Sequence, residues 1–226
     1  MNHDGQRGFH ITAPTAVTLF CTVVTLVSIA WILFMGQHLV VGFAENNKPI
    51  ALHLLLAVGF SPDERGLAQT TALHGAAVSG NVDILDSLIN EETNIDAVDI
   101  HAQTPLFLAA FYGHPEAVHK FVNSGANLER KNGKAAQSAL HIATIHKKYG
   151  AIKALLEYDF DINIQDIHGA TPLHEATNKD DVKSVKLLLE AGASKTIKMG
   201  NGMTPLMFAK QFRKEKVIPL LAEEGR

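Results

Sequence analysis

Histidine is the residue type in this chain with the widest chemical use, and twelve of the 226 residues are histidines. His174 precedes a glutamate, but position 178 is asparagine, so the second histidine of a zinc-protease helix is missing. Gly133-Lys134 is followed by Ala135, where a phosphate-binding loop needs Ser or Thr. The chain has a single cysteine and therefore no cysteine cluster. We expect no catalytic site, no metal site, no cofactor and no small-molecule substrate.

The elements that hold these histidines follow from a motif that recurs along the chain. Its copies are Thr71-Ala-Leu-His74, Thr104-Pro-Leu-Phe107, Ser138-Ala-Leu-His141, Thr171-Pro-Leu-His174 and Thr204-Pro-Leu-Met207. The copies start 33 or 34 residues apart, and alanine stands five residues after every start. A constant period of this length indicates structural units that stack, because one unit alone cannot bury its apolar face.

The motif resembles the ankyrin repeat, as do the Leu-Leu-x-x-Gly-Ala ending over 188–193 and the Asp-Ile-His-Gly turn over 166–169. The resemblance covers nearly everything after the first forty residues. It implies an all-α ankyrin-repeat solenoid, in which each unit is a helix–turn–helix followed by a β-turn finger. It also implies that the column formed by His74, His141 and His174 bridges neighbouring units by hydrogen bonds, and that the ligands are proteins.

The sequence departs from this pattern at three kinds of position. Ala102 and Ala136 stand where the turn of the finger has glycine, and Glu92 and Asp159 replace the glycine that ends the second helix. One extra residue lies near Asn132. We therefore expect softer ends of two second helices and one enlarged finger.

The period divides the chain into segments of different roles. They are an N-terminal tail (1–12), a transmembrane helix (13–36), a leading capping repeat (37–70), four full repeats (71–103, 104–137, 138–170 and 171–203) and a C-terminal capping repeat (204–226). The leading repeat is inferred from the register, since Gly59 precedes Thr71 by the same interval that separates Gly192 from Thr204, and Ala44 falls in the alanine column.

The membrane segment is predicted from charge. No charged residue stands between Ala13 and Met35, and about 20 apolar residues cross a bilayer as a helix. We expect a single-pass anchor that contacts the lipid bilayer through residues 13–36. A cleaved signal peptide is the alternative, although its apolar region normally has only about 7–15 residues. The flanking charges slightly favour a cytoplasmic N-terminus with extracytoplasmic repeats over the reverse orientation.

No linker rich in glycine or proline separates the anchor from the leading repeat. We therefore expect one continuous helix from about Pro14 to Ala44, which at 1.5 Å per residue is roughly 45 Å long. Such a helix would hold the stack rigidly at the membrane.

Two rows of positions are the candidate partner-binding residues. The finger row is Ile100, His101, Lys134, Ile167 and His168, and the row at the ends of the first helices is Phe111, Tyr112, Ile145, His146, Asn178, Lys179 and Phe212. Exposed apolar and aromatic groups usually have a partner that covers them. The alternative is that Phe111 and Ile145 pack between neighbouring units. His101, His146 and His168 either make a contact sensitive to pH or are solvated rings.

The balance of charge excludes one class of partner. The net charge is −3, with acids gathered over 62–103 and bases over 195–216, and this argues against nucleic acid. We expect a non-enzymatic, membrane-anchored protein–protein interaction module, an assembly or regulatory subunit of a membrane-associated complex. The alternative is an inhibitor or immunity protein that neutralises a toxic enzyme at the cell envelope.

Overall fold

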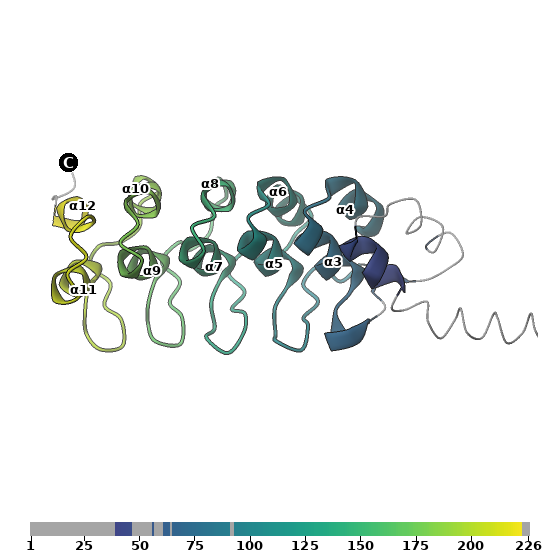
Figure 1. Cartoon of the computed structure of the whole chain (residues 1–226), viewed down its shortest axis with the longest axis horizontal. Helices are drawn as coiled ribbons and strands as arrows, with labels where there is room; N and C mark the ends of the chain where they lie inside the picture. Colours follow the sequence, from purple (N-terminus) through teal and green to yellow (C-terminus); the bar gives the residue numbers. More distant parts are fainter. Residues whose placement is uncertain (1–38, 47–55, 57–60, 64, 91–92, 223–226) are drawn as a thin grey trace, which may run out of the picture.

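The computed structural model describes residues 39–46, 56, 61–63, 65–90 and 93–222. Within these residues the chain forms successive pairs of antiparallel helices (Figure 1). The elements are a helix over 39–45, the 3₁₀ turn η1 (Leu67–Gln69), and the helices α3 (Ala72–Ser79), α4 (Val82–Leu88), α5 (Pro105–Tyr112), α6 (Pro115–Asn123), α7 (Ala139–Ile145), α8 (Tyr149–Leu156), α9 (Pro172–Asn178), α10 (Val182–Glu190), α11 (Pro205–Gln211) and α12 (Ile218–Ala222). The described residues are therefore helical, as expected.

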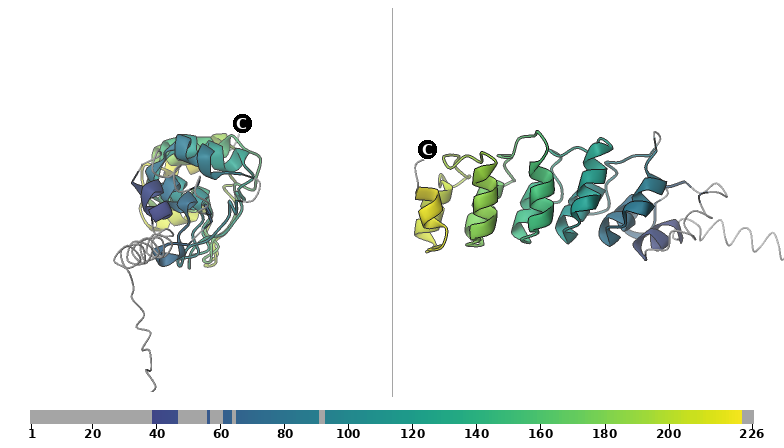
Figure 2. Two further views of the ribbon diagram at one scale, coloured as in Figure 1. Left: turned by 90° about the vertical axis from the view of Figure 1, so that its right-hand side faces the viewer. Right: turned by 90° about the horizontal axis from the view of Figure 1, so that it is seen from above.

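The helices form two layers with a row of loops beneath them. The first helices (α3, α5, α7, α9 and α11) make the middle layer, and the second helices (α4, α6, α8, α10 and α12) make the upper layer in Figure 1. The fingers that join one pair to the next hang below the first helices. Seen from above in Figure 2, the second helices lie side by side along the stack. This is the solenoid that the repeat period predicts.

The recurring motif explains why each first helix begins where it does. The hydroxyls of Thr104, Ser138, Thr171 and Thr204 accept the amide three residues ahead, which satisfies one of the unpaired donors of the first turn. In three of these helices the next residue is proline, whose missing N–H is not needed there.

The alanine column and the apolar columns form the core between the layers. Ala76, Ala109 and Ala143 are fully buried, and their small side chains let the helices approach closely. Large apolar side chains such as Leu140 and Leu173 fill the space between units. Burying one leucine contributes about 1.5–3 kcal/mol, so neighbouring units stabilise one another.

The helix over 39–45 packs against α3 at the N-terminal end of the stack. Val40 and Ala44 are fully buried there. A side chain at Gly75 of α3 would lie within 3.0 Å of the Val41 carbonyl oxygen and the Glu45 amide nitrogen, so glycine permits this close approach. The helix therefore extends the buried core beyond α3 at this end of the stack, and its role as the first helix of a leading repeat stays a prediction.

The proposed membrane segment concerns a different part of the chain. Among the described residues no helix is both long enough and apolar enough to cross a membrane. The predicted span over 13–36, and the part of the continuous helix from Pro14 to residue 38, lie outside the described residues.

Each finger is joined to the next by backbone hydrogen bonds. The amide of Gly133 donates to the Ala102 carbonyl at 3.0 Å, and the amide of Ile167 donates to the Ala135 carbonyl at 3.0 Å. At the turn position where glycine was expected, Ala102 and Ala136 are forced into the left-handed region, with φ of 56° and 52°. The fingers therefore adopt the same backbone conformation at this position even where alanine disfavours it.

The second helices end differently according to the residue available. The α6 and α10 helices, which glycines at 125 and 192 follow, have nine residues each. The α8 helix, where Asp159 replaces the glycine, has eight residues, and α4 has seven. The two helices without this glycine are thus one or two residues shorter, and the softness of their ends stays a prediction.

Candidate partner-binding surface

The buried histidines hold the stack together. In His74, His141 and His174, Nδ1 accepts the backbone N–H of the capping residue at 3.1–3.2 Å. Nε2 therefore carries the ring proton and donates to a carbonyl of the next unit at 3.0–3.2 Å. Burial is the main cause that lowers the pKa of each ring, which favours the neutral form that this pattern requires. The predicted bridging role is confirmed.

The ends of α5 and α7 form an aromatic cluster. The ring of Phe111 lies 4.4 Å from the ring of His146 and 5.0 Å from the ring of Tyr112, centre to centre. Phe111 and Ile145 are half-buried and pack against the core, so they also serve the packing role that was the alternative for them. Tyr112 is 44% exposed. Burial, followed by the charges of Lys148 and Lys179, lowers the pKa of His146.

The remaining helix-end positions continue this row toward the C-terminus. Asn178 and Lys179 at the end of α9 are exposed. Phe212, half exposed, packs its ring 4.5 Å from Phe208 after α11. Outside the two predicted rows, in the first turn of α11, Met207 is 55% exposed in the position that histidine fills in other units. Sequence reasoning missed it because this column is buried wherever another unit follows.

The finger positions divide between two hollows. Ile100, His101 and Lys134 line one hollow of about 510 Å³ between successive fingers. Ile167 and His168 line another of about 520 Å³, together with Met199. Ile100 and Ile167 are 56% and 63% exposed, which is unusual for isoleucine. The three histidines suggested for a pH-sensitive contact lie in different places, since His101 and His168 line separate hollows and the ring of His146 contacts Phe111 at a tilt of 52°.

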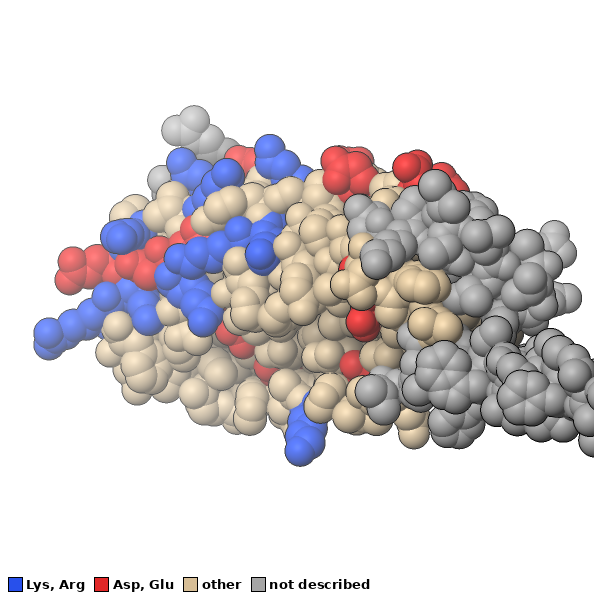
Figure 3. Space-filling model, turned by 45° about the vertical axis from the view of Figure 1, so that its right-hand side comes forward, with Lys and Arg blue, Asp and Glu red and all other residues tan. Residues whose placement is uncertain are grey.

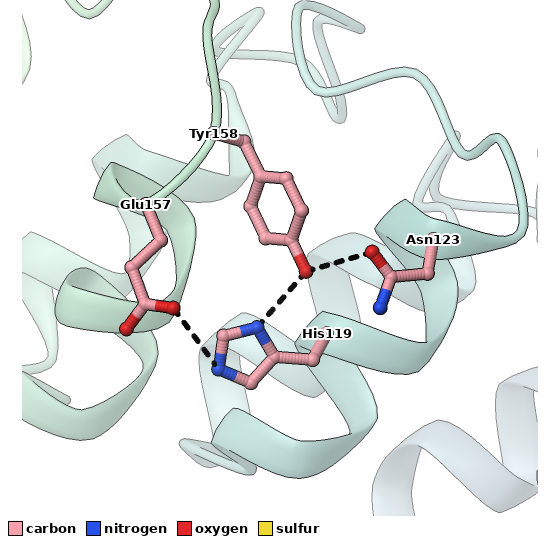
Figure 4. A network of polar contacts seen from close by, with 4 residues as sticks. All are labelled: His119, Asn123, Glu157 and Tyr158. Carbon is pink, nitrogen blue, oxygen red and sulfur yellow. Dashed lines mark hydrogen bonds and ion pairs between the residues drawn. The ribbon is translucent and has the colours of Figure 1, made fainter.

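A polar network on the second-helix layer was not predicted. The ring of His119 lies between Tyr158 and Glu157 in Figure 4. Its Nδ1 is 3.0 Å from the Tyr158 hydroxyl, which donates to the Asn123 amide oxygen, and its Nε2 is 3.9 Å from the Glu157 carboxylate. The side chains come from α6 and from the end of α8, so the network links two units.

This network lacks the features of a catalytic centre. His119 and Glu157 are open to solvent, with side-chain exposures of 36% and 66%, so water screens their interaction. In the part of the chain that the structure describes, no group of three or more His, Cys, Asp or Glu side chains is arranged to hold a metal ion. The arrangement joins two neighbouring units through side chains of α6 and of the end of α8.

The fold and these surfaces define a helical repeat protein whose exposed side chains suit contact with other macromolecules. The sequence profile described as ankyrin repeats (3 copies) matches residues 39–132 and 130–199. The chain therefore belongs to the ankyrin-repeat family, and ankyrin repeats indicate a protein–protein interaction module.

Several curated proteins share this similarity over part of their length. Inversin of Canis lupus familiaris is 32% identical over 124 residues, which are 53% of this chain and 11% of inversin. The E3 ubiquitin-protein ligase XB3 of Oryza sativa subsp. japonica is 33% identical over 55% of this chain and 31% of the ligase. The tyrosine-protein kinase HTK16 of Hydra vulgaris is 27% identical over 57% of this chain and 17% of the kinase. The chain thus spans less than a third of each of these relatives.

Proposed function

We propose that this chain is a membrane-anchored recognition subunit without catalytic activity, which assembles or regulates a membrane-associated complex. The observation that carries the recognition part is the set of exposed apolar and aromatic side chains at the finger tips and first-helix ends, above all Ile100, Tyr112 and Ile167. Such groups lose contact with water when a partner covers them, and about 25 cal/mol per Å² of apolar surface favours the complex.

The proposed binding face comprises the finger row and the helix-end row defined above. Tyr112 is the expected anchor, because a rigid aromatic ring with a polar tip is typical of interface hot spots. Its ring has the ring of Phe111 at 5.0 Å in an edge-on contact and the nearly parallel ring of His114 at 6.4 Å, centre to centre. Lys134, Asn178 and Lys179 supply polar groups at the rim.

The membrane part rests on the uncharged run over 13–35 and on the place of the helix over 39–45. Because that helix packs directly on α3, an anchor that ends shortly before it would hold the stack close to the bilayer. A cytoplasmic N-terminus with extracytoplasmic repeats is the orientation we propose. A reporter enzyme fused after Arg226 tests this orientation, since reporter activity on the cytoplasmic side alone would contradict it.

Relatives with enzymatic names do not alter the proposal of a non-catalytic chain. The kinase and the ubiquitin ligase are each matched over less than a third of their length. Ubiquitin transfer or phosphorylation catalysed by the purified chain would contradict the proposal.

The binding face is tested by comparing two variants in native membranes. Tyr112→Ser with Ile167→Ser removes two exposed apolar groups of the proposed face, whereas Met207→Ser removes an equally exposed one outside it. We expect the first variant to lose its cross-linked partner and the second to keep it, at equal expression and thermal stability. Loss in both variants, or in neither, would show that the face is wrong.

The same cross-linking separates the two kinds of binding function. A stoichiometric membrane-protein partner supports the role of a subunit. A soluble enzyme that is inactive in the complex and active after dissociation supports the inhibitor or immunity protein instead.

A further inference from the structure

A groove rich in lysine lies on the layer opposite the fingers. It has a volume of about 620 Å³ and lies between α8, α10 and the segment that leads into α12. Five lysines line it, namely Lys147, Lys153, Lys183, Lys186 and Lys216. Figure 3 shows most of the Lys and Arg side chains of this face gathered over the C-terminal end of the stack, with some Asp and Glu among them, and further Asp and Glu side chains along the upper edge nearer the N-terminal end.

Two of the three carboxylates in the groove accept hydrogen bonds from other residues of this chain. Asp181 accepts the Tyr149 hydroxyl at 3.2 Å and the Ser184 hydroxyl at 2.7 Å. The Asp180 carboxylate accepts the amide of Val217 at 3.3 Å, which links the start of α10 to the segment that leads into α12. Glu190 is exposed at the rim. The groove therefore presents an excess of positive charge to whatever enters it.

The lysines keep their charge available. All five are exposed, and no ion pair joins any of them to a carboxylate of the described residues. The ammonium group of Lys183 lies 4.1 Å from the centre of the Tyr149 ring, a contact that orients it without neutralising it. Half-buried Val182 and Leu187 give the groove an apolar part.

We propose that this groove is a second docking surface, which binds an acidic segment of a partner protein. Carboxylates of such a segment would pair with the lysines, and its backbone N–H groups would donate to Glu190 at the rim. Val182 and Leu187 would contact the methylene groups of the acidic side chains. The surface lies on the second helices and the fingers lie below the first helices, so both surfaces are accessible at once (Figure 1).

The composition of the groove favours a peptide over the other polyanions. Phosphates of nucleic acid or lipid offer acceptors only, whereas a peptide also offers backbone N–H donors that the exposed carboxylate of Glu190 can accept. The chain as a whole carries a net charge of −3, unlike a typical nucleic-acid-binding protein.

The test compares two lysine variants of the full chain in micelles of a zwitterionic detergent. The groove variant combines Lys153→Gln, Lys186→Gln and Lys216→Gln, and the control variant combines Lys131→Gln, Lys198→Gln and Lys210→Gln at exposed positions outside the groove. Both variants lower the net charge equally. The probe is a short fluorescent peptide of alternating Glu and Gly, with its Gln-for-Glu counterpart as the uncharged reference, followed by fluorescence anisotropy.

We expect the groove variant to bind the acidic peptide about tenfold more weakly than the native chain, and the control variant to lose less than about twofold. The uncharged peptide should bind neither. Equal weakening in both variants, or no binding of the acidic peptide by the native chain, overturns the proposal. Groove-dependent binding of phosphatidylserine vesicles or single-stranded DNA in place of the peptide overturns it as well, as does self-association of the native chain that the groove variant abolishes in sedimentation.

Discussion

Two neighbouring units provide different acceptors for the same buried amide, that of the residue that caps the first helix. In the unit that begins at Ser138, Nδ1 of His141 accepts the buried amide of Ser138. In the unit that begins at Thr104, Phe107 stands in the histidine column and has no acceptor to offer. There the amide of Thr104 donates instead to the side-chain oxygen of Asn132 at 2.9 Å.

The extra residue of the enlarged finger accounts for this substitution. Asn132 begins the turn between the second and third units, and its backbone pairs with Gln137 in both directions. In the other fingers Asp99 and Asp166 fill a similar place, but their carboxylates accept amides of their own turn. Asn132 is 2% exposed and turns its amide oxygen inward. The comparison shows that the fold requires an acceptor at this point, whichever residue supplies it.

Replacing His141 by phenylalanine should have the largest effect. The variant would place phenylalanine in the histidine column, as in the Thr104 unit, but with no asparagine to replace the lost acceptor. Asp166 cannot take that role, because its carboxylate already accepts the amides of His168 and Ala170. The buried Ser138 amide loses an acceptor and the bridge to the Ala170 carbonyl is lost. We expect the free energy of unfolding to fall by about 3 kcal/mol, measured by urea denaturation. A loss below about 0.5 kcal/mol would show that the ring nitrogens add little.

Removing the asparagine should have the next largest effect. Asn132→Ala leaves the Thr104 amide without its side-chain acceptor and also breaks the bond from Asn132 to the Arg130 carbonyl. We expect a loss of about 2 kcal/mol in the same assay.

The double variant with Phe107→His sharpens this result. A histidine ring at position 107 would restore an acceptor to the amide of Thr104, so the double variant should be more stable than Asn132→Ala alone. If the effects of the two substitutions simply add, the two side chains do not serve one amide, and the equivalence drawn here is wrong.

These two units also show how far the sequence predicts the structure. The period, the alanine column and the capping motif are local features repeated in the chain. They predicted the stacking of units, and the resemblance to the ankyrin repeat that they carry implied the helix pairs and the histidine bridges. The role of Asn132 depends on the path of a finger that contains one extra residue, which no repeated pattern describes. The same holds for His119 and Tyr158, which lie 39 residues apart in sequence and meet only when two units stack.

The candidate surfaces were predicted to different degrees for the same reason. Finger tips are exposed in every unit, so Ile100 and Ile167 could be identified from their position alone. Burial at the helix ends depends on the neighbouring unit, and this is why Phe111 and Ile145 pack partly into the core. The lysine groove draws residues from successive units, and its hollow shape is set by the packing of α8 and α10.

Acid should weaken the histidine units and leave the phenylalanine unit unaffected. Burial lowers the pKa of His74, His141 and His174 below 6.5, so the unfolded chain binds protons at a higher pH than the folded one. Their contribution to stability is therefore complete above about pH 6.5 and is lost as the pH falls toward the folded pKa values.

The comparison of pH profiles isolates one ring. Burial raises the pKa of Glu175, which acts in the opposite direction because the folded state then holds this proton more tightly. That contribution is common to the native chain and to His141→Phe, so it cancels in their difference. We expect urea midpoints of the native chain to fall more steeply with acid than those of the variant. Parallel profiles would mean that His141 titrates alike in both states.

The smallest expected effect concerns the turns of the fingers, where the two N-terminal units differ from their neighbours. Ala102 and Ala136 adopt the left-handed conformation that Gly169 and Gly202 adopt further along. A residue other than glycine destabilises the fold by roughly 1–2 kcal/mol in this conformation. Replacing it by glycine recovers only part of this free energy, because glycine has more conformational freedom to lose when the chain folds. We therefore expect Ala102→Gly and Ala136→Gly each to stabilise the fold by about 0.5 kcal/mol.

The reverse substitutions separate conformational strain from crowding. A Cβ at Gly202 would have no atom within 4 Å, so Gly202→Ala should lose only the conformational preference, about 1 kcal/mol. A Cβ at Gly169 would lie 2.8 Å from the amide nitrogen of Gly200, and this amide bonds to the His168 carbonyl at 2.7 Å. Gly169→Ala should therefore destabilise the fold more than Gly202→Ala does, in thermal and urea unfolding alike. Equal losses would indicate that the finger yields to the added methyl group, and that the turn position alone determines the residue.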